Sequence, residues 1–237
     1  MLLAANRDEM RERAWRAPGR HWPDRSNVVA GLDELGGGSW FGVNDDGVAA
    51  GVMNRRHTLG PSAGKRSRGE LVLEALDHAD AKTAAESLAH IDPGAYREFN
   101  LVIADSEHAY WLRHTEDADA DKIDVTLLPP GLSMVTAYDC NDLSSPRVRR
   151  YLPLWRAASA PDPEQGDWSA WQALLASREA DPGVGAEGAM NIVTDGGFGT
   201  VSSLLLALPA RERYGVKPRL RFAAGRPDVA PFEDVLI

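Results

Sequence analysis

The chain has 237 residues, of which 43% are hydrophobic and 26% are charged, values that are ordinary for a globular protein. That length is sufficient for one domain, residues 1–237, with a substantial buried core. The net charge of −9 excludes a general binder of nucleic acids or anionic membranes, because phosphate-rich partners select basic surfaces.

The first part of the chain predicts a strand and then a loop. Residues 2–5 are a short apolar run, which predicts a strand. Residues 11–28 are rich in Arg, Pro and Trp and have no periodicity, so we expect an ordered loop there. Trp15 and Trp22 are expected to hold this loop against the body of the protein by burial.

Two hairpins are predicted. The first joins strands at residues 39–43 and 48–53 through Asp46-Gly47, because glycine accepts the positive φ that such turns need. The second joins strands at residues 101–104 and 109–113.

Helices are predicted mainly in the middle of the chain. In residues 67–77, Ser67 and Glu70 have the spacing of a capping box, and apolar residues follow on one face. The acidic run at residues 116–124 is interpreted as a solvated loop rather than a cation site. The remaining predicted elements are a helix over 81–89, a strand ending at 128, a strand beginning over 133–137, a helix after Ser145-Pro146, a helix over 167–178, and strands over 201–208 and 219–223. This order of elements predicts an α+β fold rather than alternating βαβ units.

Several classes of site and location are excluded or expected from composition. Cys140 is the single cysteine, which rules out an internal disulfide and suits a reducing, cytoplasmic location. No apolar stretch approaches the roughly 18 residues of a membrane span, and no signal peptide is visible. The scattered histidines show no zinc spacing, so we expect neither a metal site nor a cofactor.

The strongest functional signal is the sequence Asn6-Arg7-Asp8-Glu9, which follows directly after the first apolar run. It places an amide, a guanidinium and two carboxylates at one strand end, which is the composition of a site. The alternative is a short edge strand followed by a solvated turn, since Asn and Asp are common turn residues.

The same tetrapeptide gives a protein family its name, and further motifs follow in order. The chain resembles the NRDE proteins, also called the transport and Golgi organisation 2 family, through that tetrapeptide and five other segments. These are Gly37-Gly38-Ser39-Trp40-Phe41-Gly42, the strand pair from Gly42 to Asn54, Arg66-Ser67-Arg68-Gly69-Glu70, Phe99-Asn100-Leu101 and Gly197-Phe198-Gly199-Thr200.

The resemblance implies a four-layer αββα sandwich of two mainly antiparallel sheets, the scaffold of N-terminal-nucleophile hydrolases. In that class the first residue supplies the nucleophile and its own α-amine serves as the base. The resemblance places Arg7 and Asp8 beside the nucleophile and Asn54 where an oxyanion is held. Asp8 would orient the amine or pair with Arg7. The alternatives are a structural ion pair for Arg7 and Asp8, and a turn residue for Asn54. We expect Asn6, Arg7, Asp8 and Asn54 to converge in one cleft.

Two departures argue against catalysis by the chain as given. Met1 and Leu2 carry no nucleophilic atom, whereas members of the family usually open with Met-Cys and a preceding strand. We therefore expect the strand at residues 2–5 to have an unpaired edge, through which copies of the chain associate. The late-strand arginine of the amidase class is also missing, although Ser202 and Ser203 remain to face a pocket.

Three further residues each allow two interpretations. Trp40 is expected in the core or in a pocket wall. Arg68 stands at a predicted helix start, where its charge opposes the helix dipole, so it is either held to meet an anion or simply solvated. Cys140 is interpreted as a small buried hydrophobe rather than a nucleophile.

Three functions remain open from the sequence. The first is a protein that handles a small molecule (an acyl or amide compound, a lipid or haem) in a pocket by the NRDE motif without catalysis, with Asn6, Trp40, Arg68 and Ser202 as ligand-binding residues. The second is an amide or thioester hydrolase or acyl transferase that uses an N-terminal cysteine upstream of this chain. The third is an interaction protein in which the motif is purely structural.

Overall fold

Two antiparallel sheets form the framework of the protein, which the computed structural model describes for residues 1–115, 122–213 and 215–237. In the four-stranded sheet the order is β1 (Leu2–Met10), β9 (Phe198–Ala207), β10 (Arg219–Ala223) and β11 (Glu233–Val235). In the seven-stranded sheet the order is β2 (Trp15–Gly19), β3 (Val28–Asp33), β4 (Phe41–Asn44), β5 (Ala49–Asn54), β6 (Phe99–Ala104), β7 (Ala109–His114) and β8 (Asp124–Leu127). All of the pairings between these strands are antiparallel.

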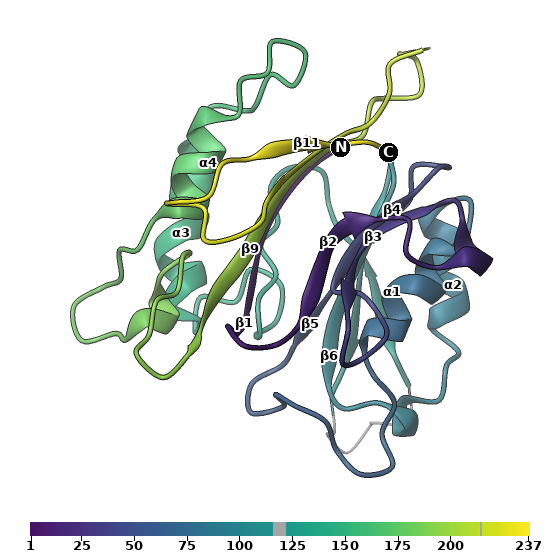
Figure 1. Ribbon diagram of the computed structural model, residues 1–237, viewed down its shortest axis with the longest axis horizontal. Coiled ribbons are helices and arrows are strands. Elements are labelled where there is room, and N and C mark those ends of the chain that lie inside the picture. Colours follow the sequence, from purple (N-terminus) through teal and green to yellow (C-terminus); the bar gives the residue numbers. More distant parts are fainter. Residues whose placement is uncertain (116–121, 214) are drawn as a thin grey trace.

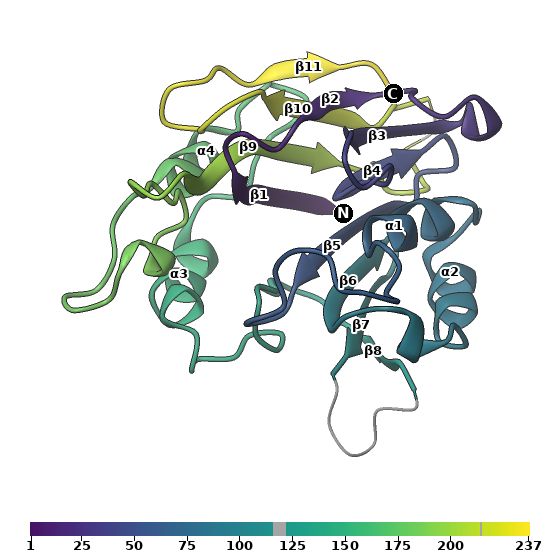
Figure 2. The same ribbon diagram turned by 60° about the horizontal axis from the view of Figure 1, so that its bottom comes forward.

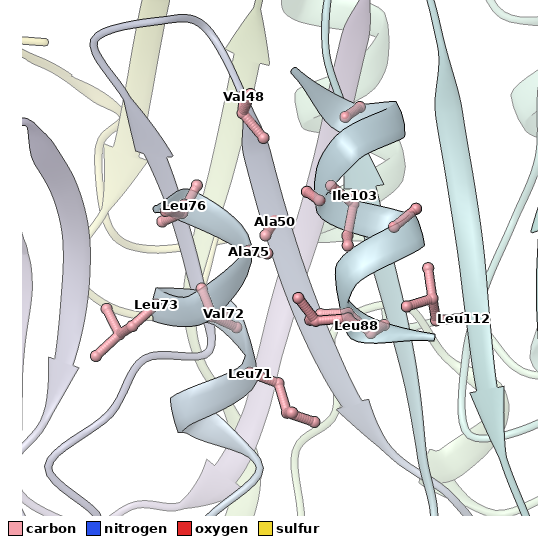
Figure 3. Packing of buried hydrophobic residues seen from close by; sticks show 14 of the residues in the cluster. Val48, Ala50, Leu71, Val72, Leu73, Ala75, Leu76, Leu88, Ile103 and Leu112 are labelled. Atoms are coloured by element: carbon pink, nitrogen blue, oxygen red, sulfur yellow. The ribbon is translucent and has the colours of Figure 1, made fainter. Parts of the chain in front are cut away.

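A pair of helices covers each sheet (Figures 1 and 2). Helices α1 (Gly69–Leu76) and α2 (Ala81–Leu88) pack on the seven-stranded sheet, and Figure 3 shows their side chains meeting Ala50, Ile103 and Leu112. Helices α3 (Pro146–Ala157) and α4 (Ser169–Ala176) share a second cluster with β1 and β9. Within the described residues, no helix has both the length and the apolar character needed to cross a membrane.

A third cluster contains residues of both sheets. It joins Val29 and Val43 of the seven-stranded sheet to Leu204, Leu206 and other apolar residues of the four-stranded sheet. Burial of apolar surface on both faces of each sheet is the main force that holds such layers together. The predicted α+β fold with two mainly antiparallel sheets is therefore confirmed.

Both predicted hairpins are present. Gly47 has φ +85° in the turn between β4 and β5, a conformation that favours glycine. Asn44, which is 1% exposed, donates to the carbonyls of Leu76 and His78 and so ties this turn to the end of α1. In the second hairpin, the carboxylate of Asp105 accepts from the backbone N–H groups of Glu107 and His108.

The prediction for the first 28 residues was wrong in two respects. Strand β1 does not stop at residue 5 but continues to Met10, so the Asn6–Glu9 motif lies inside a strand. The predicted loop at residues 11–28 contains β2 and a short 3-10 helix, Pro23–Arg25. β2 has no regular alternation because its register with β3 shifts between Arg16 and Gly19.

The predicted capping box at the start of α1 is also wrong. The Ser67 hydroxyl accepts from the backbone N–H of Gly69 at 3.3 Å, but the side chain of Glu70 accepts from Arg66 instead of reaching back, and the N-cap residue Arg68 makes no side-chain cap. The start of α1 instead lies against the Gly37–Gly38 turn: a Cβ added to Gly38 would stand 2.4 Å from the carbonyl carbon of Gly69. Close backbone packing, rather than a complete capping box, accompanies the start of the helix.

Residues 133–137 do not form the predicted strand. Their segment is irregular, and the carbonyls of Thr136 and Tyr138 accept hydrogen bonds from the side chain of Asn100 instead of from a neighbouring strand. The predicted acidic loop at residues 116–124 lies mostly outside the described residues, and its last residue, Asp124, begins β8.

Tyr96 provides a test of the packing beside α1. It is 1% exposed, its hydroxyl has no hydrogen-bond partner among the described residues, and burial raises its pKa to about 12. Between pH 10 and 12 the unfolded chain loses this proton and the folded protein keeps it. The contribution of Tyr96 to the free energy of unfolding is therefore fully present below pH 10 and falls as the pH rises. We expect Tyr96→Phe to leave the free energy of unfolding nearly unchanged at pH 7. Above pH 10 the free energy of unfolding of the unchanged protein should fall by up to about 1.4 kcal/mol per pH unit because of Tyr96, and the variant should lack this contribution.

Urea denaturation of both proteins at pH 7, 10 and 11.5 measures this difference, and groups common to the two proteins cancel. A difference in the free energy of unfolding that stays constant between pH 7 and 11.5 would contradict the prediction.

Candidate functional site

The Asn6–Glu9 motif is divided between two faces of the four-stranded sheet. Side chains alternate along a strand, and Leu2 and Ala4 pack toward α3 and α4, whereas Leu3 and Ala5 pack into the cluster between the sheets. Asn6 therefore faces the α3 and α4 side, and Arg7 faces the other sheet. The expected convergence of the motif in a single cleft does not occur.

Asn6 fastens β1 to the end of α4. Its Nδ2 donates to the carbonyl oxygens of Leu175 at 3.0 Å and Met190 at 2.8 Å. Its Oδ1 accepts from the Ser203 hydroxyl at 2.6 Å. Because both donors and the acceptor are engaged within the protein, the geometry gives Asn6 a structural role.

Asp8 also faces the helices and does not pair with Arg7. One carboxylate oxygen accepts from the Thr200 hydroxyl at 2.7 Å, and the other lies 3.0 Å from Nη1 of Arg147 on α3. A register shift between Arg7 and Asp8 accompanies this arrangement. The predicted interaction of Asp8 with Arg7 is replaced by an ion pair between β1 and α3.

We expect Asp8 and Arg147 to be energetically coupled. Both side chains are largely buried, at 16% and 17% exposure, so removing one leaves an uncompensated charge. Asp8→Ala should lower the free energy of unfolding by about 2 kcal/mol, and the loss should be much smaller when Arg147 is already alanine. Urea denaturation of the four proteins in this double-mutant cycle measures the coupling. Additive losses would contradict it.

Arg7 lies between the sheets with its charge only partly compensated. Its side chain is 7% exposed, and its guanidinium carbon lies 4.1 Å from the centre of the Trp40 ring. Its nearest carboxylate, that of Asp33, is 3.9 Å from Nη2, and Nη1 has no hydrogen-bond partner among the described residues. Burial lowers the pKa of the Arg7 guanidinium, and the charges of Asp33 and Glu9 oppose this effect.

Asp33 is committed more strongly to a different arginine. Its Oδ2 lies 2.8 Å from Nη2 of Arg13, and its Oδ1 accepts from the backbone N–H groups of Leu35 and Gly36. Glu9, in turn, lies 3.6 Å from Nε of Arg13. The carboxylates near Arg7 are thus shared with Arg13, and the buried guanidinium is left with an unused donor.

Ser202 is the residue directly opposite Arg7 in the pairing of β1 with β9. Opposed residues of an antiparallel pair place their side chains on the same face of the sheet, so Ser202 also faces the space between the sheets. It is 1% exposed, and its hydroxyl has no partner among the described residues. Arg7 and Ser202, here called the Arg7–Ser202 pair, form the candidate site together with Trp40.

Asn54 and Arg68 are placed elsewhere. Strands β1 and β5 end on the same side of the molecule in Figures 1 and 2. However, Asn54 is opposite Phe99, which packs with α1 and α2, so its side chain lies on the outer face of the seven-stranded sheet. Arg68 donates to the Thr58 hydroxyl and to the carbonyls of Thr58 and Glu98. Burial and the nearby charge of Arg97 lower the pKa of Arg68 to about 10.

A family model for Transport and Golgi organisation 2 matches residues 1–148, which is more than half of the chain. The chain belongs to the Transport and Golgi organisation 2 family. A comparison with curated proteins finds no match. The matched range contains β1 to β8 with the Asn6–Glu9 motif, whereas β9, which carries Ser202, lies outside it.

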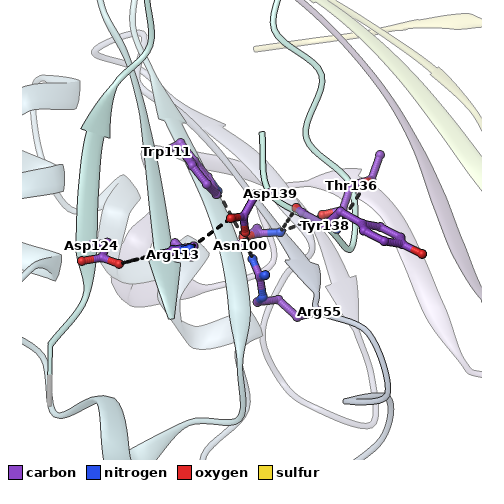
Figure 4. Close-up of polar contacts among 8 residues, drawn as sticks. All are labelled: Arg55, Asn100, Trp111, Arg113, Asp124, Thr136, Tyr138 and Asp139. Atoms are coloured by element: carbon purple, nitrogen blue, oxygen red, sulfur yellow. Dashed lines mark hydrogen bonds and ion pairs between the residues drawn. The ribbon is translucent and has the colours of Figure 1, made fainter. Parts of the chain in front are cut away.

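This member of the Transport and Golgi organisation 2 family contains a buried polar network that sequence reasoning missed (Figure 4). Asn100 is fully buried, and its Nδ2 donates to the carbonyls of Thr136 and Tyr138 at 2.8 and 2.7 Å. Its Oδ1 accepts from Nη1 of Arg55 at 2.9 Å and from Nε1 of Trp111 at 3.1 Å. The signals in the sequence were a single amide inside an apolar strand and the Phe99-Asn100-Leu101 segment of the family resemblance, and neither indicated a network.

The network continues through charged residues and ends beside the cysteine. Asp139 lies 2.7 Å from Nη1 of Arg55 and 3.0 Å from Nη1 of Arg113, which also pairs with Asp124. Burial raises the pKa of the adjacent Cys140 thiol. A raised pKa keeps a thiol protonated and poorly nucleophilic, which favours the structural interpretation of Cys140.

Proposed function

We propose that this protein handles a small molecule, such as an acyl or amide compound, a lipid or haem, that binds beside Arg7 without being chemically changed. The observation that supports this proposal is the buried guanidinium of Arg7, whose Nη1 has no partner among the described residues. A buried charge is costly unless it is paired, so its retention favours a role in binding.

The absence of catalysis is part of the proposal and has its own support. Asp8 is held by Thr200 and Arg147, which leaves it poorly placed to orient a nucleophile beside Arg7. The thiol of Cys140 has a raised pKa and stands next to Asp139, whose negative charge further disfavours a thiolate.

Titration with octanoate, N-octanoyl glycinamide and haemin tests the proposal, with tryptophan fluorescence as the readout. Trp40 and Trp15 both lie within 6 Å of the Arg7 guanidinium, so a ligand bound there should change their emission. We expect saturable binding of at least one probe, weakened in Arg7→Gln and unchanged in Arg20→Gln, whose guanidinium pairs with Asp45 on the surface. No saturable response to any probe would contradict the proposal.

A second candidate is an amide or thioester hydrolase or acyl transferase whose N-terminal cysteine lies on a strand that pairs with β1. Met1 and Leu208 exchange both backbone hydrogen bonds, so the backbone groups of Leu2, Ala4 and Asn6 point away from β9. No other described backbone group bonds to them, which leaves an edge available for pairing. Adding a Met-Cys-apolar segment before Met1 should give hydrolysis of an amide or thioester, and the same segment with its cysteine replaced by alanine should give none.

The same edge supports the third candidate, an interaction protein in which the motif is structural, as the bonds of Asn6 and Asp8 favour. An unpaired edge invites association between copies of the chain. Ala4→Pro removes an N–H that β9 does not use, so it should block edge pairing at little cost to the sheet. Sedimentation velocity should show self-association in the unchanged protein and its loss in Ala4→Pro. A monomer at all concentrations would exclude this form of association.

A further inference from the structure

Arg7 and Ser202 present two buried hydrogen-bond donors to the same space. The side chain of Arg7 is 7% exposed and Ser202 is 1% exposed, and neither Nη1 nor Oγ has a partner among the described residues. The two residues are directly opposed in the pairing of β1 with β9, so their Cβ atoms are about 5 Å apart on one face of the sheet. A carboxylate has two oxygens, so a single carboxylate can accept from both donors.

The charge around Arg7 indicates which kind of acceptor fits. The guanidinium is permanently charged, and its neighbouring carboxylate, Asp33, lies closer to Arg13 (2.8 Å) than to Arg7 (3.9 Å). A neutral acceptor would satisfy the hydrogen bond of Nη1 and leave the charge uncompensated. An anionic acceptor satisfies both, and charge-assisted hydrogen bonds are the stronger kind.

The aromatic rings around the Arg7 guanidinium are apolar and do not accept its hydrogen bonds. The guanidinium carbon lies 4.1 Å from the centre of the Trp40 ring, which offers no hydrogen-bond acceptor for the Arg7 donors because an indole nitrogen only donates. Trp15 packs edge-on against both Trp40 and Phe222. These rings and the apolar cluster between the sheets suit the hydrocarbon part of a ligand rather than a polar part.

We propose that the Arg7–Ser202 pair binds the carboxylate of an apolar carboxylic acid, with one oxygen accepting from Nη1 of Arg7 and the other from Oγ of Ser202. This assignment rests on the proposed function and specifies the anchoring group of its ligand. The hydrocarbon part of the ligand lies against Trp40 and Trp15. Ser203, the next residue along β9, has no part in the binding because its hydroxyl donates to Asn6.

A matched pair of ligands tests the anchoring group. Octanoate and methyl octanoate have the same chain, but only octanoate is an anion, and their dissociation constants can be measured by calorimetry and by tryptophan fluorescence. We expect octanoate to bind the unchanged protein at least tenfold more tightly than the ester. Loss of one hydrogen bond to a charged group in Ser202→Ala should weaken octanoate binding about tenfold and leave the ester unaffected.

Variants of Arg7 separate the inference from the proposed function. Arg7→Gln should abolish the preference for octanoate, Arg7→Lys should keep part of it, and Arg20→Gln should keep all of it. Equal binding of acid and ester, unaffected by Arg7→Gln and Ser202→Ala, would overturn the carboxylate assignment and leave the proposed function standing. Binding of neither probe nor haemin would overturn both. Circular dichroism confirms that each variant is folded, and Ser202→Ala decides the matter if the Arg7 variants are not.

Discussion

Replacement of Asn100 by leucine will lower the free energy of unfolding by about 4 kcal/mol, among the largest effects of any single change in this chain. Asn100 is fully buried and satisfies four partners: two carbonyls, a guanidinium and an indole N–H. Leucine fills a similar volume but offers no polar atom. Each partner left buried without a bond costs about 1–3 kcal/mol, and relaxation of the segment at residues 133–141 recovers part of this.

The measurement is urea denaturation, with the exposed residue Asn27 changed to leucine as a matched control. The control should change stability by less than about 0.5 kcal/mol. Cys140 gives an independent readout, because the segment that Asn100 holds also contains this cysteine. Its half-buried thiol should react faster with a thiol reagent in Asn100→Leu than in the unchanged protein. A stability loss below 1 kcal/mol together with an unchanged labelling rate would show that the network does not hold the segment.

The position of Asn100 illustrates how far the sequence could lead. Local signals predicted the hairpin of β6 and β7, since alternation and a short turn are properties of neighbouring residues. The role of Asn100 depends on carbonyls 36 and 38 residues away, and no local pattern carries that information. For the same reason residues 133–137 were predicted as a strand. Their apolar content is a local property, whereas their bonding to the Asn100 side chain in place of a neighbouring strand is not.

The candidate site could also be predicted from the sequence only in part. Resemblance to the family pointed to the Asn6–Glu9 motif, and the sequence indicated Ser202 as a residue facing a pocket. The polar residues of the motif were interpreted as the end of a strand, although β1 runs through them to Met10. Their charges are accommodated by Arg147, Thr200 and Trp40, all distant in the sequence. Alternation along a longer strand would have predicted that Asn6 and Arg7 face opposite sides.

Strands β2 and β11 were missed for reasons of geometry. Pro18 lies where β2 shifts its register against β3, so the strand has no continuous alternation. β11 has three residues, Glu233–Val235, and two of them are exposed and acidic. Such a segment has little intrinsic preference for a strand, and its pairing with β10 supplies the order.

The second large effect is expected at Arg7. Arg7→Met will raise the free energy of unfolding by about 1–2 kcal/mol and will remove the binding of anionic ligands. Burying a guanidinium costs several kcal/mol. The interactions that offset this cost are one shared carboxylate at 3.9 Å and a cation–π contact with Trp40 that contributes about 2 kcal/mol. Methionine has a similar length, carries no charge and makes favourable sulfur contacts with aromatic rings.

Arg147→Met is the matched control for this prediction, because Arg147 is also a largely buried arginine but has a carboxylate of its own. Its Nη1 lies 3.0 Å from Asp8, so the same substitution there leaves a buried negative charge and should lower stability by about 2 kcal/mol. Thermal and urea denaturation of both variants measure the contrast. If the free energy of unfolding rises in Arg7→Met and falls in Arg147→Met, the protein maintains an incompletely paired charge at Arg7 at the expense of its own stability. This is expected when a ligand completes the pairing. A similar loss of stability in both variants would show that Arg7 is already compensated in the folded chain, and the argument for a ligand at this position would then fail.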